Sequence, residues 1–482
     1  MTPTLIFTAF AIYTLLLFAV SFITSGKSDN ETFMLGNRRS PWYVVAYGMI
    51  GASLSGVTFI SIPGDVGNTQ FSYMVLVLGY LLGYFVIANV LLPLYYRLQL
   101  TSIYSYLEQR LGFWSYKTGA VFFLISRIIG ASFRMFLVVS VLQLFVFDAW
   151  GIPFWATVSM FIILIMLYTF RSGIRTIVWT DTLQTTFMLV AVVVTLLLIA
   201  TDMNLSFGGL VHEIRQSEYS RMFITDWQDR HFMVKDFLAG MFIAIVMTGL
   251  DQDMMQKNLS CRNLREAKKN IYWLSISLVP VNLLFLSLGA VLWIYASNIA
   301  GFPALGTTDQ LYPTIALQYL GPLAGITFII GLIAAAYSSA DSALTALTTS
   351  FTVDILGVMK RAELSAGRKT GIRYRVHIMI SFIVLLVIVG FNAINDSSVI
   401  SVLFTIAGYT YGPLLGMFAF GLFTKLKVRD GTVPLIAILS PAICYVLSIF
   451  DQQLFHGYDL GFELLLVNGF LTFTGLFLVH KK

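Results

Sequence analysis

Hydroxyl groups and one carboxylate crowd the middle of a stretch that is otherwise apolar, LAGITFIIGLIAAAYSSADSALTALTTSFTVDIL, at residues 323–356. On a helix the i, i+3, i+4 and i+7 positions share one face, and here they hold Ala335, Ser338, Ser339 and Ser342. Asp341 and Thr345 flank that face. Hydroxyl, carbonyl and carboxylate oxygens are the ligands of a bare alkali cation, so these residue types at this spacing indicate a cation site. The alternative is that the small residues only let two helices pack closely.

A second polar stretch supplies a partner for this face. GMIGASLSGVTFISIPGD, at residues 48–65, interrupts an apolar segment with Gly48, Gly51, Ser53, Ser55, Gly56, Thr58 and Pro63. Such a sequence predicts a broken helix whose freed backbone carbonyls bind a cation. We expect a comparable interruption at Gly408, Gly412 and Pro413, where close packing of small residues is the alternative. Two interrupted spans in two five-helix blocks are typical of an inverted-repeat transporter.

Several charged residues lie inside the apolar segments or at their edges, namely Asp65, Asp181, Asp251, Asp253, Arg127 and Arg134. Arg127 and Arg134 stand at i and i+7 and therefore share a helix face. Arginine is a preferred partner of planar carboxylates, so either arginine is a candidate for holding a substrate anion. The structural alternative is that a buried arginine only neutralises Asp251 or Asp253.

The elements that must position these residues are membrane-spanning helices. The chain has 482 residues, of which 57% are hydrophobic and 11% charged, and its mean hydropathy is +0.82. A hydrocarbon core about 30 Å thick requires roughly 20 apolar residues per helix. By that criterion we predict thirteen spans, at residues 5–24, 42–62, 73–96, 119–147, 154–170, 176–200, 237–255, 271–295, 323–350, 376–391, 399–423, 433–450 and 462–479. The chain is therefore an all-α polytopic membrane protein. Its net charge of +6 has to be interpreted loop by loop and does not indicate nucleic-acid binding.

Positive charges set the expected orientation. With the N-terminus outside, nearly all Lys and Arg residues, Lys257 among them, fall in cytoplasmic loops, and the external ones are Arg215, Arg221, Arg230 and Lys235. The C-terminus is then cytoplasmic. The sequence holds no GxxxxGK[ST] loop, no HExxH motif and no serine or cysteine with a histidine placed as its base. A nucleotide-driven pump and a membrane enzyme are thus disfavoured.

The motifs together resemble the sodium/solute symporter family, which includes bacterial sialic acid, galactose and proline transporters and animal glucose and iodide carriers. The resemblance rests on SLSGVTFISIP, WTD, AAAYSSADSALTALTTSFTVDIL and GPLLGMFAFGLF, and it covers roughly residues 33–423. It implies a LeuT-like 5+5 inverted-repeat core with one helix before it and two after it. The expected units are an N-terminal helix and loop (1–40), a first repeat (41–200), an external loop (201–236), a second repeat (237–423) and two C-terminal helices (424–482).

The resemblance also implies sodium as the coupling ion and assigns its ligands. The family's main sodium site would use the carbonyls of Gly51, Leu54 and Ala335 and the hydroxyls of Ser338 and Ser339. The second sodium site of some members would fall on Asp181, Ser338, Asp341 and Ser342. Sialic acid members carry a hydroxyl where this chain has Asp341. Two carboxylates around one site need a cation between them, or one of them takes up a proton.

For the solute, the resemblance points to Ser53, Ser55, Thr58 and Asp251, with Arg134 as a looser match because its register needs a shift of one to three residues. Val77 replaces a glutamine of sialic acid transporters, which weakens sialic acid itself as the substrate. Hydroxyls with an acid suit a neutral sugar or polyol, whereas Arg134 keeps a sugar acid or another small organic anion open.

We therefore expect a sodium-coupled symporter that imports a small polar solute by alternating access across the bacterial cytoplasmic membrane. Its partners are the solute, sodium and the lipid bilayer, with no nucleic acid. The sequence leaves the oligomeric state open, with a monomer as one possibility. The alternatives are a proton-coupled carrier of the same fold, an importer of an amino acid or other organic anion, a channel, and a solute receptor.

Overall fold

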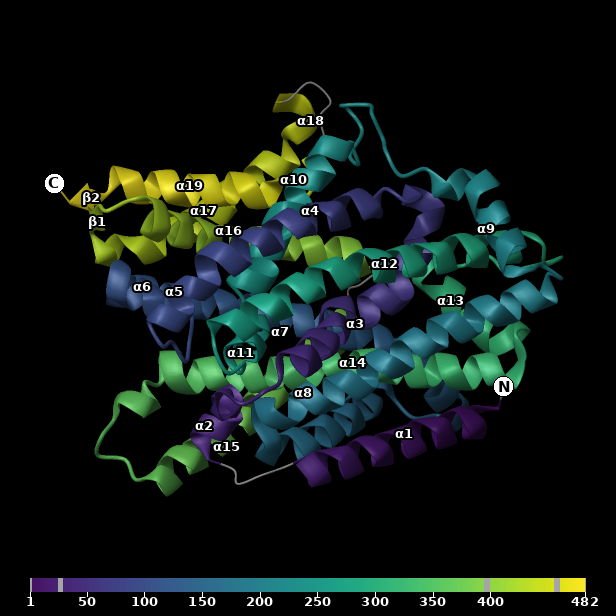
Figure 1. The fold of residues 1–482 in the computed structure, drawn as a ribbon, viewed down its shortest axis with the longest axis horizontal. Helices are drawn as coiled ribbons and strands as arrows, with labels where there is room; N and C mark the ends of the chain where they lie inside the picture. Colours follow the sequence, from purple (N-terminus) through teal and green to yellow (C-terminus); the bar gives the residue numbers. More distant parts are fainter. Residues whose placement is uncertain (1, 25–28, 394–398, 455–459, 482) are drawn as a thin grey trace.

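The structure is a computed structural model that describes residues 2–24, 29–393, 399–454 and 460–481. Helices make up nearly all of it (Figure 1). In the first half they are α1 (Pro3–Thr24), α2 (Asn30–Leu35), α3 (Trp42–Thr69), α4 (Tyr73–Val86), α5 (Leu92–Arg97), α6 (Ser105–Arg110), α7 (Phe113–Leu142), α8 (Phe154–Asp202) and α9 (Phe207–Gln216). In the second half they are α10 (Met233–Ala244), α11 (Gln252–Leu259), α12 (Leu264–Ser297), α13 (Leu311–Thr314), α14 (Gly321–Ser350), α15 (Ala366–Phe391), α16 (Val399–Phe423), α17 (Val433–Ile449), α18 (Asp451–Leu454) and α19 (Leu464–Leu478). The short strands β1 (Lys427–Val428) and β2 (His480–Lys481) pair antiparallel.

Most of these helices have the length and apolar composition of membrane spans. Among the described residues, ten helices are long and apolar enough to cross a bilayer, or eleven when the bent pair Met233–Gly249 and Gln252–Leu259 counts as one span. Phe154–Phe170 and Leu464–Leu478 are shorter apolar helices, so the predicted count of thirteen spans depends on them and stays a prediction. Phe154–Phe170 is the first arm of α8, which kinks at Gly173. There φ is +56° and an added Cβ would lie 2.3 Å from the Phe33 Cα.

The predicted break in the 42–62 span is confirmed. Inside α3, Ser55 has φ +46° and ψ 175°, which interrupts the helix between two regular arms. A residue other than glycine seldom adopts a positive φ, so the surrounding packing must hold this conformation in place. The carbonyls next to the break are released from the regular i to i−4 pattern and become available to a ligand.

The second break lies elsewhere than the sequence predicts. α16 runs without interruption through Pro413. Its glycines serve close packing against α19, because a Cβ at Gly412 would lie 2.3 Å from the Asn468 Cγ and one at Gly416 would lie 2.5 Å from the Gly469 carbonyl oxygen. The second discontinuity is between α10 and α11, which are bent by 65° at Leu250 and Asp251.

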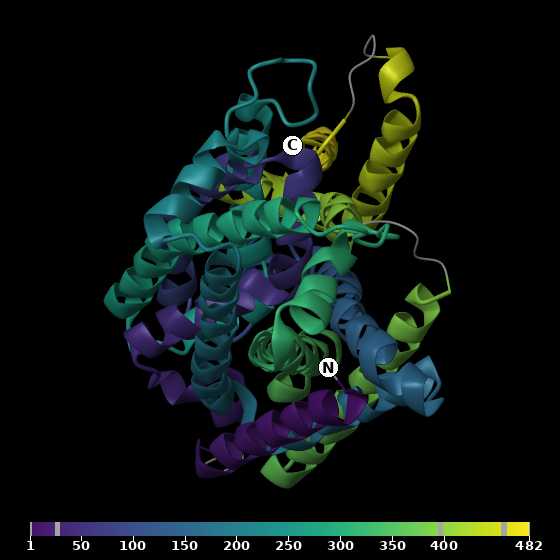
Figure 2. The ribbon, with the colours of Figure 1, turned by 90° about the vertical axis from the view of Figure 1, so that its right-hand side faces the viewer.

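α14 forms the centre of the bundle. Every residue from 331 to 350 is buried, and the helix packs against α1, α3, α7, α8 and α15. In the view along the long axis, α14 (green) is surrounded by other helices (Figure 2). A membrane helix that is buried all round faces protein and not lipid, so its polar residues can serve a site.

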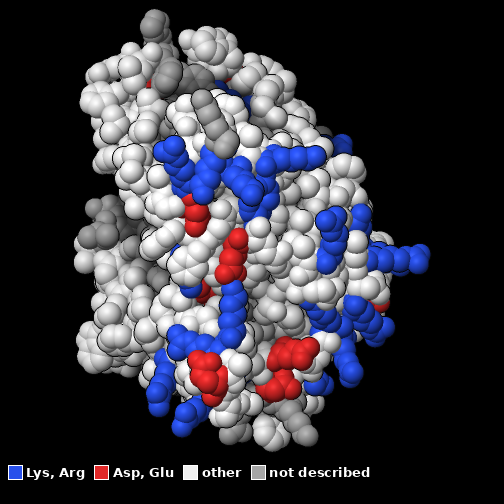
Figure 3. Space-filling model, turned by 90° about the vertical axis from the view of Figure 1, so that its left-hand side faces the viewer, with Lys and Arg blue, Asp and Glu red and all other residues white. Residues whose placement is uncertain are grey.

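One end of the molecule is rich in positive charge. The N-terminus and α9 lie at the right of Figure 1, whereas the C-terminus, β1, β2 and the loop between α14 and α15 lie at the left. Lys and Arg side chains gather on this left-hand end (Figure 3). The termini therefore lie at opposite ends of the long axis.

Candidate functional site

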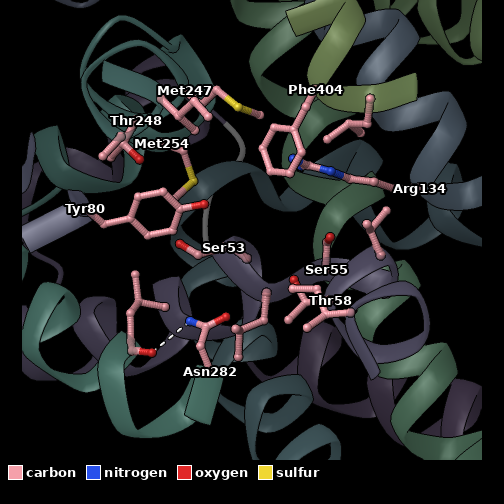
Figure 4. A pocket seen from close by; sticks show the side chains of 18 of the residues that line it. Ser53, Ser55, Thr58, Tyr80, Arg134, Met247, Thr248, Met254, Asn282 and Phe404 are labelled. Atoms are coloured by element: carbon pink, nitrogen blue, oxygen red, sulfur yellow. Dashed lines mark hydrogen bonds between the residues drawn. The ribbon is translucent and has the colours of Figure 1, made fainter. Parts of the chain in front are cut away.

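A cavity lies beside the break in α3. Its polar lining includes Ser53, Ser55, Thr58, Tyr73, Tyr80, Tyr84, Arg134, Thr248 and Asn282. Figure 4 shows side chains from several helices around this space, with Phe404 and Met254 among its apolar members. Of the residues that the family resemblance assigns to the solute, Ser53, Ser55, Thr58 and Arg134 line this cavity.

Several polar groups on the cavity wall have hydrogen-bonding capacity left for a ligand. The Ser53 hydroxyl is buried next to Tyr84. The Tyr73 and Tyr80 hydroxyls lie 3.3 Å apart. Asn282 donates to the Leu278 carbonyl over 2.8 Å, the dashed line of Figure 4, and its side-chain oxygen is not used in that bond. These groups are neutral hydrogen-bonding partners of the kind that orient a hydroxylated ligand.

The two arginines on α7 have different surroundings. Arg127 forms ion pairs with Asp253 and, over 3.9 Å, with Asp251. Arg134 is 8% exposed and its Nε has no hydrogen-bond partner. No described carboxylate lies within ion-pair distance of Arg134. The structural alternative drawn from the sequence therefore holds for Arg127, whereas Arg134 presents a buried cation to the cavity.

Asp251 does not line the cavity and instead secures the break between α10 and α11. Its Oδ1 accepts the backbone N–H groups of Asp253 and Met254 and so caps α11. Tyr411 donates its hydroxyl to Asp251 Oδ2. The hydrogen-bonding capacity of Asp251 is thus largely used within the protein. Its role in solute binding, which the resemblance implies, stays a prediction.

α3, α8 and α14 meet at a second polar centre. Ser338 on α14 donates to Asp181 Oδ1 on α8 over 2.7 Å. The Asp181 Cβ lies 2.9 Å from where a Cβ on Gly48 of α3 would stand. Gly51 donates its backbone N–H to Thr185 on α8 over 3.1 Å. Helix α8 thus packs against the α3 segment before the break and against the serine face of α14.

On α14 three polar atoms are buried without a hydrogen-bond partner among the described residues. They are the Ser339 hydroxyl, the Thr345 hydroxyl and Asp341 Oδ1, in residues that are at most 2% exposed. The other Asp341 oxygen accepts the Tyr168 hydroxyl over 2.9 Å. Buried oxygens without partners are rare because they lose water without compensation. Ser338 donates a hydrogen bond to Asp181, so the lone pairs of its oxygen point away from that bond. The residue types on this face and their burial fit a desolvated cation.

The position of Lys257 differs from the one that the sequence predicts. Hydropathy and charge predict it in a cytoplasmic loop, yet it lies on α11, is 1% exposed and donates to Asp181 Oδ2 over 2.7 Å. The reason is that α11 continues inside the protein after the break at Asp251, which places its polar residues beside a buried carboxylate. The one signal in the sequence was the pattern of Met254, Met255 and Leu259 continuing the apolar segment past the acids.

Broken helices that meet around a central cavity, with buried cation-binding chemistry beside them, define a secondary membrane transporter. The sequence model described as "Sodium:solute symporter family" matches residues 33–434. The chain therefore belongs to the sodium:solute symporter family. It is a transporter and not an enzyme, and sodium is its coupling ion.

Individual relatives are distant but match along nearly the full length. The chain is 23% identical to the sodium/sialic acid symporter NanT of Aliivibrio fischeri, over 94% of this chain and 89% of the relative. It is 24% identical to the sodium-coupled monocarboxylate transporter 2 of Bos taurus, over 86% and 69%. The structure of a Na⁺-coupled sialic acid symporter in a substrate-bound outward-open state superposes with a TM-score of 0.83 at 20% identity, over 99% of both chains. That likeness shows the shared fold.

Proposed function

We propose that this transporter imports a small, hydroxylated organic acid, with a sugar acid as the leading candidate, together with sodium. The observation that carries the proposal is Arg134, a buried guanidinium that faces the cavity with no described carboxylate to pair with. An uncompensated buried charge is costly, and a solute carboxylate is the counter-ion that a guanidinium binds best. The names of the two relatives described above also refer to organic acids, sialic acid and monocarboxylates.

The remaining cavity wall supports a solute with hydroxyl groups. Ser53, Thr58 and Asn282 offer neutral donors and acceptors, and the ring of Tyr80 offers an apolar face on which a sugar ring packs. A neutral sugar or polyol would satisfy these groups but would leave Arg134 without a counter-ion. A monocarboxylate without hydroxyl groups would pair with Arg134 but would leave the neutral donors and acceptors without partners. A sugar acid satisfies both and is therefore preferred.

Sodium would bind where the α3 break meets the serine face of α14. The proposed ligands are the carbonyls of Gly51, Leu54 and Ala335 and the hydroxyls of Ser338 and Ser339. Bound sodium would hold the two arms of α3 against α14 and so fix Ser53 and Ser55, which lie in the same break and line the cavity. Binding of the ion and of the solute are thereby coupled through one segment of backbone.

The proposed arrangement in the membrane follows the charge distribution. The Lys- and Arg-rich end of Figure 3 would face the cytoplasm, with the N-terminus outside and the C-terminus inside. Thirteen spans, with inverted repeats at residues 41–200 and 237–423, agree with this orientation. A bacterial cytoplasmic membrane would supply the sodium gradient. One charge moved across 100 mV is worth about 2.3 kcal/mol.

Uptake into proteoliposomes tests the proposal. A panel pairs each sugar acid with its neutral sugar, beside lactate and amino acids, with an inward sodium gradient and with choline in its place. We expect sodium-dependent uptake of a sugar acid but not of its neutral pair. Arg134→Gln should weaken that uptake about 10- to 100-fold, the loss of a charged hydrogen bond of roughly 1.5–3 kcal/mol, whereas Arg215→Gln on exposed α9 should not.

Two outcomes would overturn parts of the proposal. Equal uptake of acid and neutral sugar, unaffected by Arg134→Gln, would remove the carboxylate from the proposed substrate. Uptake that persists in choline and rises with an inward proton gradient would favour the proton-coupled carrier.

A further inference from the structure

Both oxygens of Asp181 accept hydrogen bonds from within the protein. Its Oδ2 accepts the Lys257 ammonium over 2.7 Å, and its Oδ1 accepts the Ser338 hydroxyl over 2.7 Å. With its amide nitrogen turned toward this carboxylate, Gln184 is a further donor to Oδ1 over 3.1 Å. Asp181 and Lys257 are each 1% exposed, so water does not compete for either.

The Lys257 ammonium has the charge of a sodium ion and lies 2.7 Å from Asp181 Oδ2. It approaches the carboxylate at a contact distance, and a second cation on the same oxygens would meet both the occupied space and direct charge repulsion in a medium of low dielectric constant. Lys257 lies on α11, the helix that follows the 65° bend and that Asp251 caps. The bend therefore positions the ammonium.

Asp341 is the other carboxylate of this region, and among the described residues it forms no ion pair with Lys257. Its Oδ2 accepts the Tyr168 hydroxyl over 2.9 Å, and its Oδ1 has no hydrogen-bond partner there. The Lys257 ammonium therefore neutralises Asp181 and not Asp341. Ser338 donates to Asp181, and the remaining lone pairs of its oxygen stay available to the proposed first sodium ion.

We infer that Lys257 is a built-in cation that replaces a second sodium ion beside Asp181, so that the protein binds one sodium ion in each transport cycle. This inference rests on the proposed function, because it concerns how many ions the proposed sodium site works with. Asp181 then acts as a positioning residue for Ser338 and not as a sodium ligand.

Counting bound ions tests this without knowledge of the solute. Purified protein in detergent is titrated with ²²Na⁺ in a choline background, and the bound ions per protein are measured by scintillation proximity. The wild type and Lys257→Arg should bind one ion. Lys257→Met, which empties the position beside Asp181, should bind two with a Hill coefficient above one. The double variant Lys257→Met with Asp181→Asn, which removes both charges, should return to one.

Two ions in the wild type, or one ion in a folded Lys257→Met variant, would overturn the inference. Folding is checked by size-exclusion elution, and if Lys257→Met does not fold, the counts for the wild type and Lys257→Arg decide the question. Absence of bound ²²Na⁺ in every variant would contradict sodium coupling itself, so a failure of the proposed function is distinguishable from a failure of this inference alone.

Discussion

The hydroxyls of Ser338 and Ser339 are neighbours on α14 but have different partners. Ser338 donates to Asp181 and is thereby oriented, whereas Ser339 is buried with no partner among the described residues. An alkali ion coordinated by both hydroxyl oxygens would compensate for the burial of Ser339 and would bind the free lone pairs of Ser338. The two serines thus contribute in different ways to one proposed site.

Ser339→Ala should raise the sodium concentration for half-maximal ²²Na⁺ binding about tenfold or more, since an interaction between a buried polar group and a charge is worth roughly 1.5–3 kcal/mol. Thermal stability in choline should change little, because Ser339 has no partner in the protein to lose. Thr327→Ala, on the same helix but bonded only to its own turn, is the matched control. A sodium affinity equal to that of the control would remove Ser339 from the site.

Asp341→Asn separates the two roles open to this carboxylate. If Lys257 replaces a second sodium ion beside Asp181, the substitution should change the half-maximal sodium concentration by less than about twofold, because no sodium ligand is lost. Tyr168→Phe, which removes the hydroxyl bonded to Asp341, should behave alike. A tenfold loss of sodium affinity in Asp341→Asn alone would make Asp341 a sodium ligand, as the family resemblance implies.

Along the helices, two contacts show how closely the bundle is packed. A Cβ at Gly240 on α10 would lie 2.0 Å from the Leu76 carbonyl oxygen on α4, and one at Gly79 on α4 would lie 2.1 Å from the Phe237 carbonyl oxygen. These two glycines therefore let α4 and α10 approach backbone to backbone, as small residues do in membrane bundles. Helix α10 also leads into the bend before Asp251.

Gly240→Ala should destabilise the protein by about 1–3 kcal/mol, the usual cost of overpacking a tight contact. The expected result is a lower midpoint of thermal unfolding in detergent, with reduced sodium binding because the α10–α11 bend shifts. Gly130→Ala on α7, where an added Cβ meets no atom within 4 Å, is the control and should keep the wild-type midpoint. Equal midpoints for the two variants would show that α4 and α10 separate without cost.

For the complete bundle, the distribution of charge sets its direction in the membrane. Positive side chains gather at the end that carries β1, β2 and the loop between α14 and α15, while α9 lies at the other end (Figures 1 and 3). Both native cysteines, Cys261 and Cys444, are buried. Engineered surface cysteines can therefore report on the two ends separately.

Arg361→Cys, in the loop after α14, should react with a membrane-impermeant maleimide only after intact cells are opened, because positive loops stay in the cytoplasm. Arg215→Cys on α9 should react in intact cells. Both positions are exposed. The unsubstituted protein provides the background, and the reverse labelling pattern would invert the proposed orientation.

Properties that depend on neighbouring residues were predictable from the sequence. Apolar segments of sufficient length predict helices, glycine, serine and proline around Ser55 predict the break in α3, and the spacing of Ser338 and Ser339 predicts one polar face. The neutralising role of Arg127 was also among the alternatives. Each of these follows from local hydropathy, backbone preference or helical periodicity, which act within a few turns of chain.

What depends on contacts between distant segments was not predictable. Lys257 and Asp181 are 76 positions apart in the sequence, and nothing in the residues around either one indicates that they form an ion pair. Arg127 forms ion pairs with two carboxylates, whereas Arg134 on the same helix forms none among the described residues. The reason is that the start of α11 lies beside Arg127 and not beside Arg134. The same glycine-rich composition breaks α3 but lets α16 pack continuously on α19. In each case the outcome is set by which groups the packed helices bring within a few ångströms, where burial makes an unpaired charge or an overlapping atom costly.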